Sequence, residues 1–251
     1  MQAVEVFNVT KKFPVYEDMP HNEQIIDGSF YALCGISFSI TSGECTIIAG
    51  ANGSGKSVLM SVIAGLEEPT SGSVKTSSRA GLVFQEPDSQ ILGETPREDI
   101  AFGPRNMKLS KNEIKARVYA SLSLTGLEDR ADFPARSLSG GEKRRLACAG
   151  VLAMDARIII FDEPYANMDY PGVVQVNRLF QKLIGDGKTV IILTHELEKC
   201  LALSNRFIVL CKGKKVYDGS ASDALSCNLE EWGIHHPLKN SARELGDLLW
   251  L

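Results

Sequence analysis

The chain has 251 residues, of which 44% are hydrophobic and 23% charged, a composition typical of soluble globular proteins. Asp and Glu number 31 against 27 Lys and Arg, and the resulting net charge of −4 argues against a non-specific nucleic-acid binder. The six cysteines include no CxxC pair, which disfavours metal knuckles and a disulfide framework and indicates reduced thiols. No apolar run approaches the ~20 residues of a membrane-spanning helix.

The N-terminal part of the chain predicts strands around an exposed loop. Val4 and Val6 alternate with Glu5 and Phe7, which is the period of a strand. Residues 14–30 are rich in Pro, acids and Asn and predict the loop. A second, half-buried strand is predicted where apolar and serine residues alternate, at Ile36, Phe38 and Ile40.

Short, continuous apolar runs follow at residues 45–49, 158–161 and 190–193. Such runs suit parallel strands that are covered on both faces, and helical stretches separate them. The pattern predicts an α/β fold with a mainly parallel core sheet and N-terminal antiparallel strands.

Two further regions predict helices. Residues 95–150 lack β-branched runs and carry a capping-box pattern at Ser110 and Glu113, so we expect a helical subdomain inserted into the α/β lobe. Residues 1–94 and 151–225 would form that lobe, and residues 226–251 would form one packed helix. The apolar positions at helical spacing in this tail are Leu238, Ala242, Leu245, Leu248 and Leu249.

The sequence GANGSGKS at residues 50–57 fits the phosphate-loop pattern G-x-x-x-x-G-K-[ST]. Gly50 and Gly55 let the backbone curl so that its N–H groups face phosphate oxygens. Lys56 would reach the β- and γ-phosphates of ATP, and the Ser57 hydroxyl would hold Mg²⁺. A glycine-rich turn without a ligand gives the same bare pattern, but the strand before it and the helix after it favour a P-loop NTPase. The remaining phosphate-binding candidates are Asn52, Gly53, Ser54 and Val58.

A buried strand at residues 158–162 ends in Asp162, and Glu163 follows. A carboxylate at the end of a central strand can hold the metal beside the phosphates, and its neighbour can polarise a water in line with the γ-phosphate. The alternative is an ordinary acidic pair where a strand meets a loop. With the phosphate loop present, we favour Asp162 as a Mg²⁺ ligand and Glu163 as the catalytic base.

The segment LSGGEKRR at residues 138–145 distinguishes among the classes of P-loop NTPase. A Ser and two Gly that open a helix form a second anion-binding terminus, which one nucleotide site does not need unless two chains share nucleotides. Here the chain resembles the ATP-binding cassette (ABC) ATPases, whose signature motif is LSGGQ. The resemblance implies that Ser139, Gly140, Gly141 and Glu142 contact the ATP of a second ABC ATPase in a homo- or heterodimer.

The resemblance assigns further roles in chain order. Gln85 is similar to the glutamine that contacts Mg²⁺ and the attacking water, and Asp169 to the aspartate of the D-loop. His195 is similar to the histidine that reaches the γ-phosphate, although a lone histidine after a strand is more often structural. Phe13 is the best match for the aromatic residue that stacks on adenine. Tyr16 and Tyr31 are the alternatives.

A subfamily resemblance lies in residues 84–107, which read FQEPDSQILGETPREDIAFGPRNM. They are similar to the ATPase subunits of energy-coupling-factor (ECF) importers of vitamins, cobalt or nickel. This implies an integral membrane scaffold and a substrate-binding membrane subunit as partners, no nucleic acid, and a peripheral position on the cytoplasmic face of the membrane. Gln90 and the residues after it become a candidate docking surface, unless Pro87, Asp88 and Gln90 merely shape a turn.

The sequence departs from the family at two places. Val58 replaces the usual threonine, which removes one hydroxyl from the α-phosphate, and the D-loop reads YANMDY at residues 165–170. Three other functions compete with the ECF interpretation. They are the ATPase of another ABC importer or exporter, a soluble ABC ATPase of DNA repair or translation, and a plain P-loop kinase. A kinase would need neither LSGGE nor His195.

Overall fold

The computed structural model describes residues 1–15 and 23–238, whose ten strands form a central sheet of six strands and a second sheet of four. Five strands of the central sheet are mutually parallel, and the sixth, β10, pairs antiparallel with β9 at one edge. The strands lie in the order β10-β9-β4-β8-β7-β6, which confirms the predicted α/β class. Their bounds are β4 Cys45–Ala49, β6 Ala80–Val83, β7 Ile158–Asp162, β8 Thr189–Leu193, β9 Arg206–Cys211 and β10 Lys214–Gly219.

Both faces of the central sheet are covered, which explains why its strands read as continuous apolar runs. Along β4, Ile47 packs into one core with Phe180 of helix α5 (Tyr170–Gly185). The next residue, Ile48, packs into the opposite core with helix α1 (Lys56–Ile63) and the N-terminal strands. Successive side chains of a strand point to opposite faces, so apolar residues are needed at every position.

A second, antiparallel sheet has the order β2-β3-β1-β5. Its strands are β1 Gln2–Pro14, β2 Ile25–Ile26, β3 Ser29–Thr41 and β5 Ser71–Thr76. The prediction of a loop over residues 14–30 is therefore wrong at both ends. Phe13 lies opposite Phe30 and Pro14 opposite Ser29 across β1 and β3. Cross-strand aromatic pairing stabilises the strands there in spite of the polar composition of the segment.

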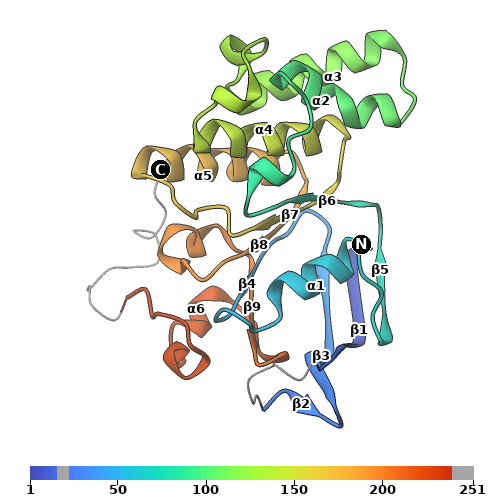
Figure 1. Ribbon diagram of the computed structural model, residues 1–251. Helices are drawn as coiled ribbons and strands as arrows, with labels where there is room; N and C mark the ends of the chain where they lie inside the picture. Colours follow the sequence, from blue (N-terminus) through green and yellow to red (C-terminus); the bar gives the residue numbers. More distant parts are fainter. Residues whose placement is uncertain (16–22, 239–251) are drawn as a thin grey trace.

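The helical subdomain stands at one end of the molecule (Figure 1). It contains α2 (Pro96–Asn106), α3 (Lys111–Thr125) and α4 (Gly140–Ala153), which enclose a core of their own. The capping box predicted at Ser110 and Glu113 begins α3. In the described part of the chain, no helix has the length and apolar character to cross a bilayer.

Short helical elements complete the structure. The described part of the tail, to residue 238, carries a 3₁₀ helix at Leu229–Trp232 rather than the predicted α-helix, because Gly233 in the left-handed conformation ends it. Most of the tail's helix-spaced apolar positions, from Ala242 onward, lie outside the described residues. The other short elements are α6 (Ala221–Ala224) and 3₁₀ helices at Pro87–Ser89, Glu128–Arg130, Ala135–Ser137, Leu197–Lys199 and Leu201–Leu203.

Candidate nucleotide-binding site

The glycine-rich loop joins the end of β4 to the start of α1 and approaches neighbouring backbone closely. A Cβ at Gly50 would lie 2.3 Å from the carbonyl oxygen of Leu210 and 2.4 Å from Ser54 Oγ. Gly55 has φ +102°, and a Cβ there would lie 2.5 Å from the carbonyl oxygen of Ala32. Both positions therefore require glycine, as the phosphate-loop pattern predicts.

A cavity of about 220 Å³ lies over this loop. It brings together most of the predicted phosphate and metal residues. It is lined by Phe30, Ala32, Asn52, Gly53, Ser54, Gly55, Lys56, Ser57, Val58, Gln85, Asp162 and Glu163. Ser54 Oγ is buried and has no hydrogen-bond partner in the described structure. Because a buried hydroxyl without a partner is costly, the loop suits a ligand that brings hydrogen-bonding oxygens.

Lys56 is the buried cation of the cavity. Its Nζ donates to the carbonyl oxygens of Gly50, at 2.6 Å, and Ala51, at 3.2 Å. It also lies 3.9 Å from Glu163 Oε1. Burial lowers the pKa of Lys56, although Glu163 and Asp162 oppose this shift. The ammonium is thus held at the loop by backbone oxygens and is available to a phosphate.

Ser57 and Asp162 form the predicted metal pair. Ser57 Oγ donates to Asp162 Oδ2 at 3.2 Å, across the space between α1 and the end of β7. Burial raises the pKa of Asp162, while the bond from Ser57 and the charge of Lys56 oppose the shift. A hydroxyl and a carboxylate beside a phosphate loop are the oxygen ligands that Mg²⁺ prefers, so the donor set fits this ion.

Glu163 is held by the loop that follows β8. Its backbone has φ +43°, an unusual value for a residue with a side chain, and its N–H donates to the carbonyl of Leu193 at 2.8 Å. The fully buried Thr194 donates its hydroxyl to Glu163 Oε2 at 3.0 Å, and His195 Nδ1 lies 2.9 Å from Glu163 Oε1. The predicted base and histidine are therefore in contact. Thr194 was not predicted, although its place directly before His195 offered a signal.

The signature residues lie at the start of α4, where Ser139 and Glu142 form a capping box. Ser139 and Gly140 are exposed, and none of the four signature residues lines the phosphate-loop cavity. Asp169 caps α5 by accepting from the N–H of Gly172 at 3.0 Å. The structure thus keeps the signature apart from the cavity of its own chain.

Arg144 connects the signature helix to the cavity and was not predicted. Its buried guanidinium donates to the carbonyls of Gln85 at 2.8 Å, Pro164 at 2.9 Å and Ala166 at 2.8 Å. It therefore ties α4 both to the backbone of the cavity residue Gln85 and to the segment after Glu163, including Ala166 of the D-loop. A buried arginine in a basic run carries no sequence signal that separates it from its exposed neighbours.

The aromatic candidates for adenine differ in their surroundings. Neither Phe13 nor Tyr31 lines the cavity, whereas Phe30 does. Phe13 is the cross-strand neighbour of Phe30 and so belongs to the same face of the sheet. The Tyr31 ring lies 4.5 Å from Lys12 Nζ, and Tyr16 lies outside the described residues.

Gln90 adopts the turn-shaping role that the sequence left open. Its side chain accepts from the N–H of Phe84 at 3.1 Å and donates to the carbonyl of Leu82 at 2.9 Å. These bonds fix the loop that follows β6.

A phosphate loop between a parallel strand and a helix, with a lysine and a hydroxyl–carboxylate pair beside it, defines a P-loop nucleoside triphosphatase. A model of the family described as "ABC transporter" matches residues 33–166, more than half of the chain. The chain therefore belongs to the ABC transporter family and is an ABC-type ATPase, which binds ATP.

Known proteins agree with this assignment. The chain is 37% identical to the energy-coupling factor transporter ATP-binding protein EcfA of Carboxydothermus hydrogenoformans, over 94% of this chain and 88% of that one. Among solved structures, cbiO1 of Clostridium perfringens, described as part of an ABC transporter complex, matches at TM-score 0.77 and 31% identity, covering 90% and 91% of the two chains. A dimeric ATP-binding cassette, MJ0796, bound to ADP and Pi, matches at TM-score 0.75 and 29% identity, covering 87% and 98%.

Proposed function

We propose that this chain is the ATP-hydrolysing subunit of an ECF-type importer and powers uptake of a micronutrient, either a vitamin or a transition-metal ion. It would act as one half of a dimer of ATP-binding cassettes, on the cytoplasmic face of a membrane that its partner subunits span. The similarity of residues 84–107 and of the EcfA relatives favours this over another ABC transporter.

One observation carries the proposal beyond family membership, namely an apolar groove beside the 84–107 segment. The groove, about 110 Å³ in volume, lies between this segment and α4. Leu92 is 66% exposed and Phe102 is 48% exposed, and Met154 extends the apolar surface. Large side chains exposed together in this way mark a contact surface for a partner. The groove is lined by Gln90, Leu92, Asp99, Phe102, Gly103, Ala147, Gly150, Val151 and Met154.

The chemistry follows from the cavity residues. Lys56 would bind the β- and γ-phosphates, and Ser57 and Asp162 would hold Mg²⁺, with Gln85 beside them. Bound Mg²⁺ neutralises charge that develops on the phosphates. Glu163 would orient and deprotonate the attacking water, and Thr194 and His195 would fix its carboxylate.

The second half of each site would come from the partner cassette. Ser139, Gly140 and Gly141 would contact the nucleotide bound by the other chain, because they lie apart from their own cavity. ATP would favour the closed dimer and hydrolysis the open one, which couples turnover to the membrane subunits. Phe13 and Phe30 would form the adenine platform.

Affinity purification from native membranes tests the transporter role. We expect the wild-type chain to recover integral membrane proteins, and Leu92→Glu/Phe102→Glu to lose them while its ATPase activity remains. The matched control is Tyr119→Glu, because Tyr119 is 70% exposed on α3 but away from the groove. Recovery of ribosomes or nucleic acid, or equal membrane recovery by all variants, would contradict the proposal.

A further inference from the structure

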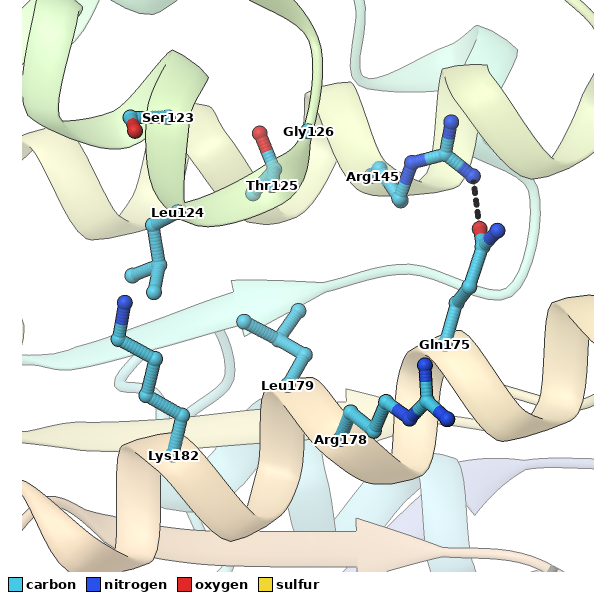
Figure 2. A pocket seen from close by; sticks show the side chains of 9 residues that line it. All are labelled: Ser123, Leu124, Thr125, Gly126, Arg145, Gln175, Arg178, Leu179 and Lys182. Carbon is cyan, nitrogen blue, oxygen red and sulfur yellow. Dashed lines mark hydrogen bonds between the residues drawn. The ribbon is translucent and has the colours of Figure 1, made fainter. Parts of the chain in front are cut away.

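A second groove, unrelated to the nucleotide cavity, lies between the C-terminal turn of α3 and one face of α5 (Figure 2). Its volume is about 330 Å³, larger than that of the phosphate-loop cavity. Leu179 and Thr125 are buried in its walls, and Arg145 of α4 closes one end. It is lined by Ser123, Leu124, Thr125, Gly126, Arg145, Gln175, Arg178, Leu179 and Lys182.

The groove is positively charged. Arg145, Arg178 and Lys182 line it, and its described lining contains no Asp or Glu. No ion pair of these three cations occurs among the residues that the structure describes, whereas Lys143 and Lys188 nearby in the chain both have carboxylate partners. A concentration of unneutralised cations is notable in a chain whose net charge is −4.

The cations are placed to act together. Gln175, Arg178 and Lys182 are three and four residues apart on α5 and so share one helix face. Figure 2 shows Lys182 directed toward Leu124 at one end of the groove and Arg178 directed toward Gln175 at the other, with Leu179 between them, so a ligand that contacts both cations must extend along the groove. Arg145 Nη1 donates to Gln175 Oε1 at 2.7 Å, which orients the guanidinium and leaves its other N–H groups for a ligand (Figure 2).

Other nearby groups do not neutralise the cluster. The C-terminal ends of α3 and α5, the latter beside Lys182, each carry roughly half a negative charge, against three positive side chains. Its own N–H and the Ser123 hydroxyl lower the pKa of the Glu128 carboxyl, and among the described residues Glu128 forms no ion pair with the three cations. The groove therefore retains a net positive potential.

We propose that this groove binds a small soluble anion that carries several phosphate groups. A guanidinium donates two parallel hydrogen bonds to a phosphate, and a neighbouring lysine adds a point charge. Arg145 lies about 180° around α4 from Met154, so the groove faces away from the apolar groove that would meet membrane partners. This placement favours a soluble phosphate compound over a lipid headgroup. In this respect the inference rests on the proposed function, whereas the charge and geometry of the groove do not.

The ligand would also bridge the two parts of the cassette. It would contact α3 and α4 of the helical subdomain on one side and α5, which follows the D-loop, on the other. Because the signature residues belong to α4, occupancy of the groove would restrict their movement relative to the central sheet.

Calorimetric titration of inorganic tripolyphosphate into the full chain tests the site, with saturating ADP present so that the phosphate loop is filled. We expect tripolyphosphate to bind the ADP-loaded wild type, and Arg178→Gln/Lys182→Gln to weaken binding at least about tenfold. The matched control is Lys111→Gln/Lys115→Gln, an exposed pair at the same spacing at the other end of α3. This pair should change the affinity by less than about twofold.

Absence of binding to the ADP-loaded wild type would overturn the inference, and so would equal losses in both double variants, since these indicate diffuse electrostatics. A second arm uses phosphatidylglycerol vesicles. Groove-dependent binding to vesicles without binding of tripolyphosphate would assign a lipid headgroup and also overturn it. Gln175→Leu, which removes only the bond that orients Arg145, gives an independent variant and should weaken tripolyphosphate binding severalfold. None of these results depends on recovery of membrane partners, so this inference and the transporter role fail separately.

Discussion

The two glycine-rich turns of the chain differ in how much of a binding site each builds around itself. The phosphate loop lies among buried charged groups that are already paired, with Lys56 on backbone carbonyls and Asp162 on Ser57. The signature turn at Ser139 caps α4 and is exposed. The phosphate loop is thus organised before any ligand binds, whereas the signature turn presents its N–H groups at the surface. This difference is what a site completed by a second chain requires.

The largest effect is expected in the phosphate-loop cavity, from Glu163→Gln. The amide keeps the shape of the side chain but cannot accept the proton of the attacking water, so phosphate release should fall by ~10²–10⁴-fold. ATP binding should remain, and size-exclusion chromatography with ATP should show a trapped dimer.

The exposed Glu68→Gln is the control for removal of one carboxylate. Turnover retained in Glu163→Gln would show that the catalytic base lies elsewhere, and the phosphate-loop cavity would then be a binding site only.

Arg144→Met breaks the connection between the signature helix α4 and the phosphate-loop cavity. It leaves the carbonyls of Gln85, Pro164 and Ala166 without their donor, and we expect the free energy of unfolding to fall by about 3 kcal/mol. Chemical denaturation measures this loss. The exposed Arg136→Met should be close to neutral, and equal stability of the two variants would contradict the role of Arg144.

The sequence predicted the features that depend on neighbouring residues and missed those that depend on long-range contacts. Local patterns found the buried strands, the phosphate loop and the acids that follow β7, because each depends on a few consecutive residues. Arg144 makes contacts with residues up to 59 positions away, and nothing periodic marks such a pairing. The strand pairing of Phe13 with Phe30 was missed for the same reason, since their local composition predicts a loop.

Thr194→Val tests whether the base must be held in place. The hydrogen bond to the carboxylate is worth about 1.5–3 kcal/mol, so kcat should fall by ~10–100-fold while KM for ATP changes little. Thr194→Ser should restore most of the activity, because it keeps the hydroxyl.

Thr189→Val is the matched control. Thr189 is also a buried threonine at β8, and its hydroxyl accepts a hydrogen bond from Gly43 at 3.0 Å, far from Glu163 in the chain. Both valine variants should lose some thermal stability, but only Thr194→Val should lose turnover. Equal turnover in the two would show that the bond to Glu163 is structural.

The smallest effect is the pH dependence of ADP affinity, which follows from the burial of charged groups in the phosphate-loop cavity. Burial raises the pKa of Asp162, so this carboxyl takes up a proton at a higher pH than an ordinary aspartic acid, and Mg²⁺-dependent ADP affinity should fall as the pH drops through that range. Burial lowers the pKa of Lys56, so the ammonium loses its charge below the usual lysine value of about 10.4, and affinity should fall again as the pH rises. The affinity for ADP should therefore stay constant over a narrower pH interval than Asp and Lys with ordinary pKa values would give. Asp162→Asn should weaken binding and remove the acid limb but leave the alkaline one, whereas an acid limb that persists in this variant would assign the titration to another group.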